Sequence, residues 1–220
     1  IHAMFLLTAI NSIKLKFALH KFLKNMLQKL VTLLKKHSLD GYLIPSTDEF
    51  LGEYTPPHLA RLEWLTGFGG SNGLAIITTK KNGFLTDGRY TTEAKLLFGK
   101  AYDVLDWAEV EVHKNWFFKN LNKKKVGFDP MLFSYNQFKM LNGISKNCGF
   151  TLEVVEQNLV DFLWNREQGK KGVAYFLDKK ITGVESRDKI KHVCESFAGD
   201  ADFLLLTNPD SICWLLNMRG

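Results

Sequence analysis

Cysteine is scarce in this sequence, and the three that occur are far apart. Cys148, Cys194 and Cys213 give no Cys-x-x-Cys spacing, and their odd number argues against a disulfide framework. We interpret them as buried free thiols of a protein kept in a reducing compartment.

Two further absences narrow the function. The six histidines show neither His-x-His nor His-Glu-x-x-His spacing, so we expect no metal site within this chain. No apolar run approaches the roughly 20 residues that a membrane-spanning helix needs, so no membrane partner is expected.

Acidic residues are missing from one end of the chain. Residues 1–38 hold seven lysines and no acid, whereas 22 of the 29 basic residues and all 23 acidic residues lie beyond residue 38. The net charge of +6 therefore comes from one segment, and the rest of the chain is close to neutral. Because a nucleic-acid-binding domain usually carries its basic residues on the folded surface, we expect no nucleic-acid partner.

The lysine-rich segment also carries a helical pattern. Residues 1–3 read as a cloning remnant and 1–25 as an N-terminal extension. Apolar residues recur at helical spacing from Leu15 onward, with lysines on the other face. We predict a continuous helix over residues 23–36, with Leu27, Leu30 and Leu34 buried against a sheet. A targeting or membrane-surface helix remains the alternative.

The glycine-rich stretch TGFGGSNGLAII, residues 66–77, resembles a phosphate-binding loop only superficially. A dinucleotide site needs a helix directly after the glycines, so that the helix N-terminus faces the phosphates. Here an apolar strand pattern follows, and then Asn82-Gly83, which is a strong hairpin signal. We therefore expect a tight connection with at least one positive φ angle and no bound phosphate.

Strand and helix patterns alternate along the rest of the chain. The class is therefore α/β, with a mixed sheet flanked by helices over residues 40–155. We expect strands near residues 42–44, 74–79, 83–87, 102–107, 124–130 and 151–156, and helices near 58–66, 91–98, 112–122 and 134–145.

A weak internal repeat divides the chain. The stretch from Asp40 to Asp48 has the same spacing as the stretch from Asp202 to Asp210, and each is followed by a Trp-Leu pair and a glycine. We predict one unit over residues 26–165 and the start of a second, similar α/β unit over 173–220, with its first strand in the second stretch. By the plan of the first unit, we expect the chain to be cut within the second.

Six segments in order carry a resemblance to a known family. They are YLIPSTDEFLGEY, WLTGFGGSNGLAII, LTDGRY, VGFDP, NLVDFLW and PDSICWLLNMRG. Together they resemble the N-terminal half of Xaa-Pro aminopeptidases (aminopeptidase P) of the three-domain type, in which two creatinase/prolidase N-terminal-like domains precede a catalytic "pita-bread" domain. The resemblance covers about residues 26–220, and the sequence departs from the family pattern at Phe50 and Gly52.

The resemblance implies a cytoplasmic, dimeric hydrolase that removes the first residue from peptides with proline in second position. Two divalent metal ions, commonly manganese, would lie in the catalytic domain, which is absent from this chain, so we expect no catalytic or metal-binding residue here. This fragment alone is expected to be inactive and to contribute to dimerisation and to the substrate pocket. A prolidase or creatinase relative fits less well, because it would carry one N-terminal unit. A stand-alone, non-catalytic binding module of the same fold is the alternative.

Arg89 is the single candidate site residue. In the family that the chain resembles, the arginine of the TDGRY segment reaches toward the bound peptide, and a guanidinium suits a carboxylate or a peptide carbonyl. The alternative is that Arg89 pairs with Asp87 or another local acid and only braces the turn. Asp87 and Tyr90 are themselves interpreted as structural. The nearby acids Asp48, Glu49 and Glu53 are interpreted as a solvated loop.

Overall fold

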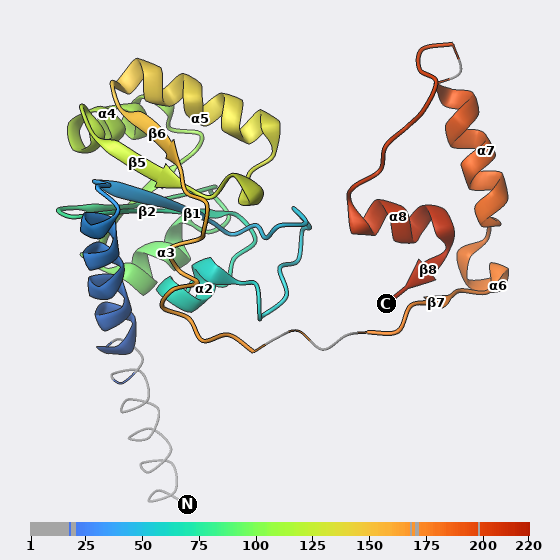
Figure 1. Cartoon of the computed structure of the whole chain (residues 1–220), viewed down its shortest axis with the longest axis horizontal. Coiled ribbons are helices and arrows are strands. Elements are labelled where there is room, and N and C mark those ends of the chain that lie inside the picture. Colours follow the sequence, from blue (N-terminus) through green and yellow to red (C-terminus); the bar gives the residue numbers. More distant parts are fainter. Residues whose placement is uncertain (1–17, 19–20, 168, 170–171, 198) are drawn as a thin grey trace, which may run out of the picture.

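The computed structural model describes residues 18, 21–167, 169, 172–197 and 199–220. Its larger part is a six-stranded mixed sheet with helices on both faces (Figure 1). The strand order is β4-β3-β2-β1-β5-β6, which confirms the predicted α/β class. The strands are β1 (Gly41–Pro45), β2 (Gly73–Thr78), β3 (Asn82–Thr86), β4 (Tyr102–Asp106), β5 (Lys125–Phe128) and β6 (Thr151–Val154).

The direction of the strands decides which loops meet. β2 runs antiparallel to both β1 and β3, whereas β4 is parallel to β3, β5 is parallel to β1, and β6 is parallel to β5. The carboxyl ends of β1 and β3 therefore lie at the same end of the sheet as the amino end of β2. The residues that follow β1 and β3 and those that precede β2 are brought together there.

Each face of the sheet has its own apolar core. Alternate residues of a strand point to opposite faces, so Tyr42 and Ile44 join one core and Leu43 joins the other. The first core lies under a helix over residues 21–36, α2 (Arg61–Thr66) and α3 (Thr91–Phe98). The second lies under α4 (Val110–Leu121) and α5 (Tyr135–Cys148), which cover the other face in Figure 1.

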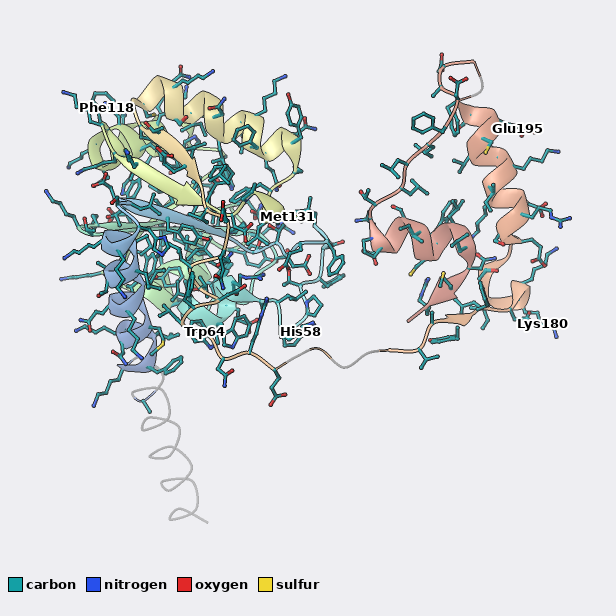
Figure 2. All side chains as sticks on the ribbon, viewed as in Figure 1. His58, Trp64, Phe118, Met131, Lys180 and Glu195 are labelled. Carbon is teal, nitrogen blue, oxygen red and sulfur yellow. The ribbon has the colours of Figure 1, made fainter. Side chains whose placement is uncertain are left out.

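The N-terminal helix packs on the sheet. Residues 21–36 are helical, and Leu30 and Leu34 are fully buried, as predicted, whereas Leu27 is only half-buried at the margin of the core. Phe22 contacts Trp64 of α2 edge-on at 5.9 Å, and Trp64, labelled in Figure 2, stacks on Trp164 at 5.4 Å. This packing favours the domain helix over the targeting interpretation. Most of the lysine-rich extension, including Leu15, lies outside the described residues.

The hairpin between β2 and β3 forms, but not where the Asn-Gly pair indicated. Residues 79–81 make the turn, and Asn82 and Gly83 already lie in β3. The Asn82 side chain accepts the backbone N–H of Thr78 at 3.0 Å. Position 83 requires a glycine for a reason other than the turn, because a Cβ atom there would lie 2.8 Å from the Trp116 ring.

The glycine-rich stretch connects α2 to β2 as expected. Gly67 caps α2 in the left-handed region with φ of 79°, which confirms the predicted positive φ angle. Gly73 begins β2, so a strand and not a helix follows the glycines. A Cβ atom at Gly70 would lie 2.4 Å from the Phe68 ring, so this glycine allows the loop to pass close to an aromatic side chain.

Residues 172–220 form a smaller part around the pair β7 (Tyr175–Phe176) and β8 (Met218–Arg219), with α6 (Lys179–Thr182), α7 (Ser186–Ser196) and α8 (Pro209–Leu216). The strand predicted between Asp202 and Asp210 is wrong: residues 201–208 form no strand, and α8 begins at Pro209. A strand needs a neighbour for its ladder, and no described strand lies beside this segment.

A buried lysine joins the two longer helices of this part. Lys189 of α7 donates from Nζ to the carbonyl of Trp214 at 2.9 Å and to Oδ1 of Asn217 at 2.6 Å. The same ammonium lies 4.4 Å from the centre of the Trp214 ring. These contacts hold α7 to the carboxyl end of α8, where partial negative charge favours a cation.

The thiols match the prediction in part. Cys148 is buried, but Cys213 is half-buried and Cys194 is exposed. Burial raises the pKa of the Cys148 thiol. Within the residues that the structure describes, no helix combines the length and apolar character required to cross a bilayer.

Candidate functional site

A cavity of about 440 Å³ lies at the end of the sheet where β1, β2 and β3 bring their loops together. Its walls come from the segments after β1 and β3, from α2, and from the glycine-rich stretch before β2. The polar side chains among its lining residues are Ser46, Glu53, Tyr54, Thr55, Glu63, Ser71, Arg89 and Tyr90.

Hydroxyl groups hold these walls together. Ser46 follows β1, and its Oγ donates to the carbonyl of Ser71 at 2.9 Å and accepts the N–H of Gly73 at 3.3 Å. The hydroxyls of Ser71 and Tyr90 are 3.1 Å apart. The loop after β1 is thereby joined to the start of β2, and that start is joined to the turn after β3.

Arg89 lies on this rim with its side chain 67% exposed, as expected for a residue that meets a partner. It also pairs with Asp87, as the alternative required: Nε donates to Oδ1 at 3.0 Å and Nη2 to Oδ2 at 2.8 Å. Among the described residues, Nη1 has no hydrogen-bond acceptor. The arginine is thus braced along one edge of its guanidinium and open along another.

The local charges are strongly coupled. Hydrogen bonds from Arg89 lower the pKa of Asp87 to about 2, and the same bonds raise the pKa of Arg89. The hydrogen bond to Ser71 lowers the pKa of Tyr90. Asp87 is therefore a carboxylate throughout the neutral range, and the Arg89–Asp87 pair carries no net charge there.

The interpretation of the loop after β1 as solvated is wrong for two of its three acids. Asp48 is 2% exposed, and its Oδ1 accepts the N–H of Phe50 at 3.0 Å. Glu49 pairs with Arg61 of α2, at 2.6 Å between Oε1 and Nη2. Glu53 is exposed, as expected, and it lines the cavity.

Arg61 is the centre of a buried ion-pair network that sequence reasoning missed. It is 2% exposed, and besides Glu49 it donates from Nε to Oδ1 of Asp161 at 2.8 Å and from Nη2 to Oδ2 at 2.9 Å. Arg166 shares Asp161 at 3.2 Å. One signal was available: Arg61 lies four residues before the buried Leu65 and so on the inner side of α2.

The described residues contain no group of three or more His, Cys, Asp or Glu side chains placed to hold a metal ion. The other residue that sequence reasoning missed is Asn72, which directly precedes β2 and donates from Nδ2 to Oδ2 of Asp87 at 2.7 Å. No local pattern marks Asn72, because its partner is fixed only when β2 pairs with β3.

Comparison with known families gives two matches along the chain. The sequence model of the Creatinase/Prolidase N-terminal domain matches residues 26–157, and a second model with the same description matches residues 165–220. The first match covers the whole six-stranded sheet.

Relatives of the whole chain are similar at about one third identity. A probable Xaa-Pro aminopeptidase P of Botryotinia fuckeliana is 34% identical over 200 residues, covering 86% of this chain and 30% of the relative. Xaa-Pro aminopeptidase 1 of Dictyostelium discoideum is 32% identical over 208 residues, covering 88% and 33%. This chain spans about a third of the length of these relatives.

A solved structure has a similar fold. The X-prolyl aminopeptidase from Caenorhabditis elegans, described as a cytosolic enzyme with a di-nuclear active site, aligns with a TM-score of 0.77 and 27% identity. The alignment covers 90% of this chain and 34% of that one.

Proposed function

Because this chain belongs to the creatinase/prolidase N-terminal domain family, we propose that it is the N-terminal, non-catalytic part of a metal-dependent Xaa-Pro aminopeptidase. The substrate would be a peptide with proline in second position, from which the enzyme removes the first residue. The observation that carries this proposal is the free edge of Arg89 on the rim of a cavity. The chain that holds it aligns with about a third of the length of an Xaa-Pro aminopeptidase.

The metals of such an enzyme would lie outside this chain. The described residues do not fit a di-nuclear centre, since they offer no cluster of three ligands. We propose that two divalent ions, manganese by preference, are held by a catalytic domain in the longer protein. Within this chain the contribution is to bind and orient the peptide.

We also propose a domain organisation and an oligomeric state for the protein. Residues 1–25 would form an extension, 26–165 a first creatinase-like domain and 173–220 the start of a second. A cytoplasmic homodimer is proposed, with this region contributing to the dimer contact. Sedimentation of the full-length protein tests the dimer, and a monomer at micromolar concentration would contradict it.

Arg89→Lys in the full-length, manganese-loaded enzyme is expected to lower kcat/KM for an Xaa-Pro peptide at least about tenfold. An ammonium cannot reproduce the planar fork that keeps one edge on Asp87 and presents another to the substrate. The melting temperature should change little, because the side chain is largely exposed. Steady-state kinetics and a thermal melt on the same protein make the test.

Arg187→Lys is the matched control, since Arg187 is exposed on α7 and away from the cavity lining. Arg187→Lys should leave both kcat/KM and the melting temperature unchanged. Normal turnover with a lowered melting temperature for Arg89→Lys would remove Arg89 from the site.

This chain expressed alone is expected to show no turnover of an Xaa-Pro peptide with manganese added. Robust hydrolysis that survives removal of contaminating peptidases would overturn the non-catalytic assignment. Full-length protein that binds proline-containing peptides without cleaving them would favour the alternative of a binding module.

A further inference from the structure

The carboxylate of Asp87 is saturated with hydrogen bonds. Oδ1 accepts the backbone N–H of Arg89 and its Nε, both at 3.0 Å. Oδ2 accepts Nη2 of Arg89 at 2.8 Å and Nδ2 of Asn72 at 2.7 Å. Four donors on two oxygens leave this side chain little freedom to turn.

Asn72 anchors Asp87 to the sheet. The backbone carbonyl of Asn72 accepts a hydrogen bond from the hydroxyl of Thr86, a fully buried residue at the end of β3. The bond therefore joins the residue before β2 to the last residue of β3, where the two strands pair at Gly73 and Thr86. Asp87 is held from the sheet on one side and holds Arg89 on the other.

This arrangement fixes which part of Arg89 is free. The guanidinium offers two pairs of parallel N–H bonds, and Asp87 occupies the pair made by Nε and Nη2. The pair made by Nη1 and the second N–H of Nη2 remains, and no acceptor for Nη1 lies among the described residues. The Tyr90 ring, 5.1 Å from Cζ, further restricts the guanidinium plane.

The same arrangement changes what the free edge attracts. Asp87 neutralises the charge of Arg89, and the acidic side chains that line the cavity are Glu53 and Glu63. A free carboxylate approaching this rim therefore meets a neutral pair and two acids. An uncharged peptide carbonyl needs only the two N–H groups and meets no repulsion.

We propose that Asp87 is a positioning residue that holds the free edge of Arg89 toward the cavity and cancels its charge, so that the site binds a backbone carbonyl of a peptide in preference to a terminal carboxylate. This inference rests on the proposed function, because it requires that Arg89 meets the substrate. It assigns to Asp87 and Asn72 a role in substrate selection beyond support of a turn.

The test uses the full-length, manganese-loaded enzyme and two substrates, an Xaa-Pro-Xaa tripeptide with a free carboxylate and the same tripeptide as its C-terminal amide. Asp87→Asn keeps the shape and one acceptor but removes the charge. The ratio of kcat/KM for the acid to kcat/KM for the amide is expected to rise about three- to tenfold, as one unit charge at several ångströms allows. Glu111→Gln, on the opposite face of the sheet in α4, removes the same charge and should leave the ratio unchanged.

A pH profile adds an independent readout. Because hydrogen bonds from Arg89 hold the pKa of Asp87 at about 2, its charge should not change between pH 5 and 8, and the wild-type ratio should stay constant over that range. Asn72→Ala retains the charge but loosens the carboxylate, so kcat/KM should fall for both substrates by a common factor. This second variant keeps the inference testable if Asp87→Asn does not fold.

The possible results distinguish a failure of this inference from a failure of the proposed function. Cleavage of both substrates with an unchanged ratio in Asp87→Asn would overturn this inference alone, as would an Asn72→Ala variant with wild-type kcat/KM. A wild-type enzyme that cleaves neither substrate would overturn the proposed function and this inference with it.

Discussion

Replacing Arg61 by alanine is expected to lower the free energy of unfolding of this chain by about 3–5 kcal/mol. The substitution leaves Glu49 and Asp161, whose side chains are only 29% and 19% exposed, without the buried cation that they share. Unpaired carboxylates in such a place must be hydrated, protonated or moved, and each of these destabilises the fold. Urea unfolding followed by far-UV circular dichroism measures the loss.

Arg166→Ala is the matched control. Arg166 contacts the same Asp161 at 3.2 Å, but its side chain is 29% exposed, so its loss should cost less than about 1 kcal/mol. A triple variant, Arg61→Met with Glu49→Gln and Asp161→Asn, removes all three charges and should regain much of the stability that Arg61→Ala loses. Equal losses for the two arginine variants would contradict the importance assigned to Arg61.

The cost of Arg61→Ala should also depend on pH. Burial alone would raise the pKa of Glu49, but the hydrogen bonds from Arg61 outweigh burial and lower it. Stability from this pairing is therefore present above the ordinary carboxyl pKa of 4.5 and is lost as the pH falls through the lowered value. The difference between wild type and Arg61→Ala should shrink in acid, and a difference that grows there would refute the explanation.

Leu30→Ala is expected to cost about 2–5 kcal/mol, because Leu30 has no exposed surface and its truncation leaves a cavity under the N-terminal helix. The range reflects how far the helix can settle onto the sheet. The same urea titration measures this loss of stability. The urea concentration at the unfolding midpoint should fall, and the dependence of the unfolding free energy on urea concentration should stay the same.

Leu96→Ala offers the same chemical change on a helix at a site that is 82% exposed, and its effect should stay within about 0.5 kcal/mol. If Leu30→Ala proved as mild as this control, the helix over residues 21–36 would not be part of the core. That outcome would return it to the targeting interpretation.

The sequence predicts those features that short segments determine. The turn at Gly67, the strand at Tyr42 and the helix from Thr91 each follow from local apolar patterns and their breakers, and all are present. The TDGRY segment predicted Arg89 as a site residue, and its partner Asp87 lies only two residues away in the same segment.

Features that depend on distant partners could not be predicted in this way. Glu49 has the pattern of a solvated loop residue, because its partner Arg61 lies 12 residues further along the chain. Arg61 is in turn held by Asp161, which lies 100 residues beyond it. The strand expected after Asp202 fails for the same physical reason, because an apolar run becomes a strand only beside another strand.

That segment has a practical consequence for anyone who handles the chain by itself. Phe203 and Leu205 are 81% and 78% exposed, and Leu204 between them is half-exposed, so a run of bulky β-prone side chains and unused backbone groups faces water. Such a segment can pair with the backbone of a neighbouring molecule, and in a concentrated solution this pairing leads to aggregation. We therefore expect these three residues to promote association of this chain during storage and crystallisation, and Leu204→Lys should reduce it.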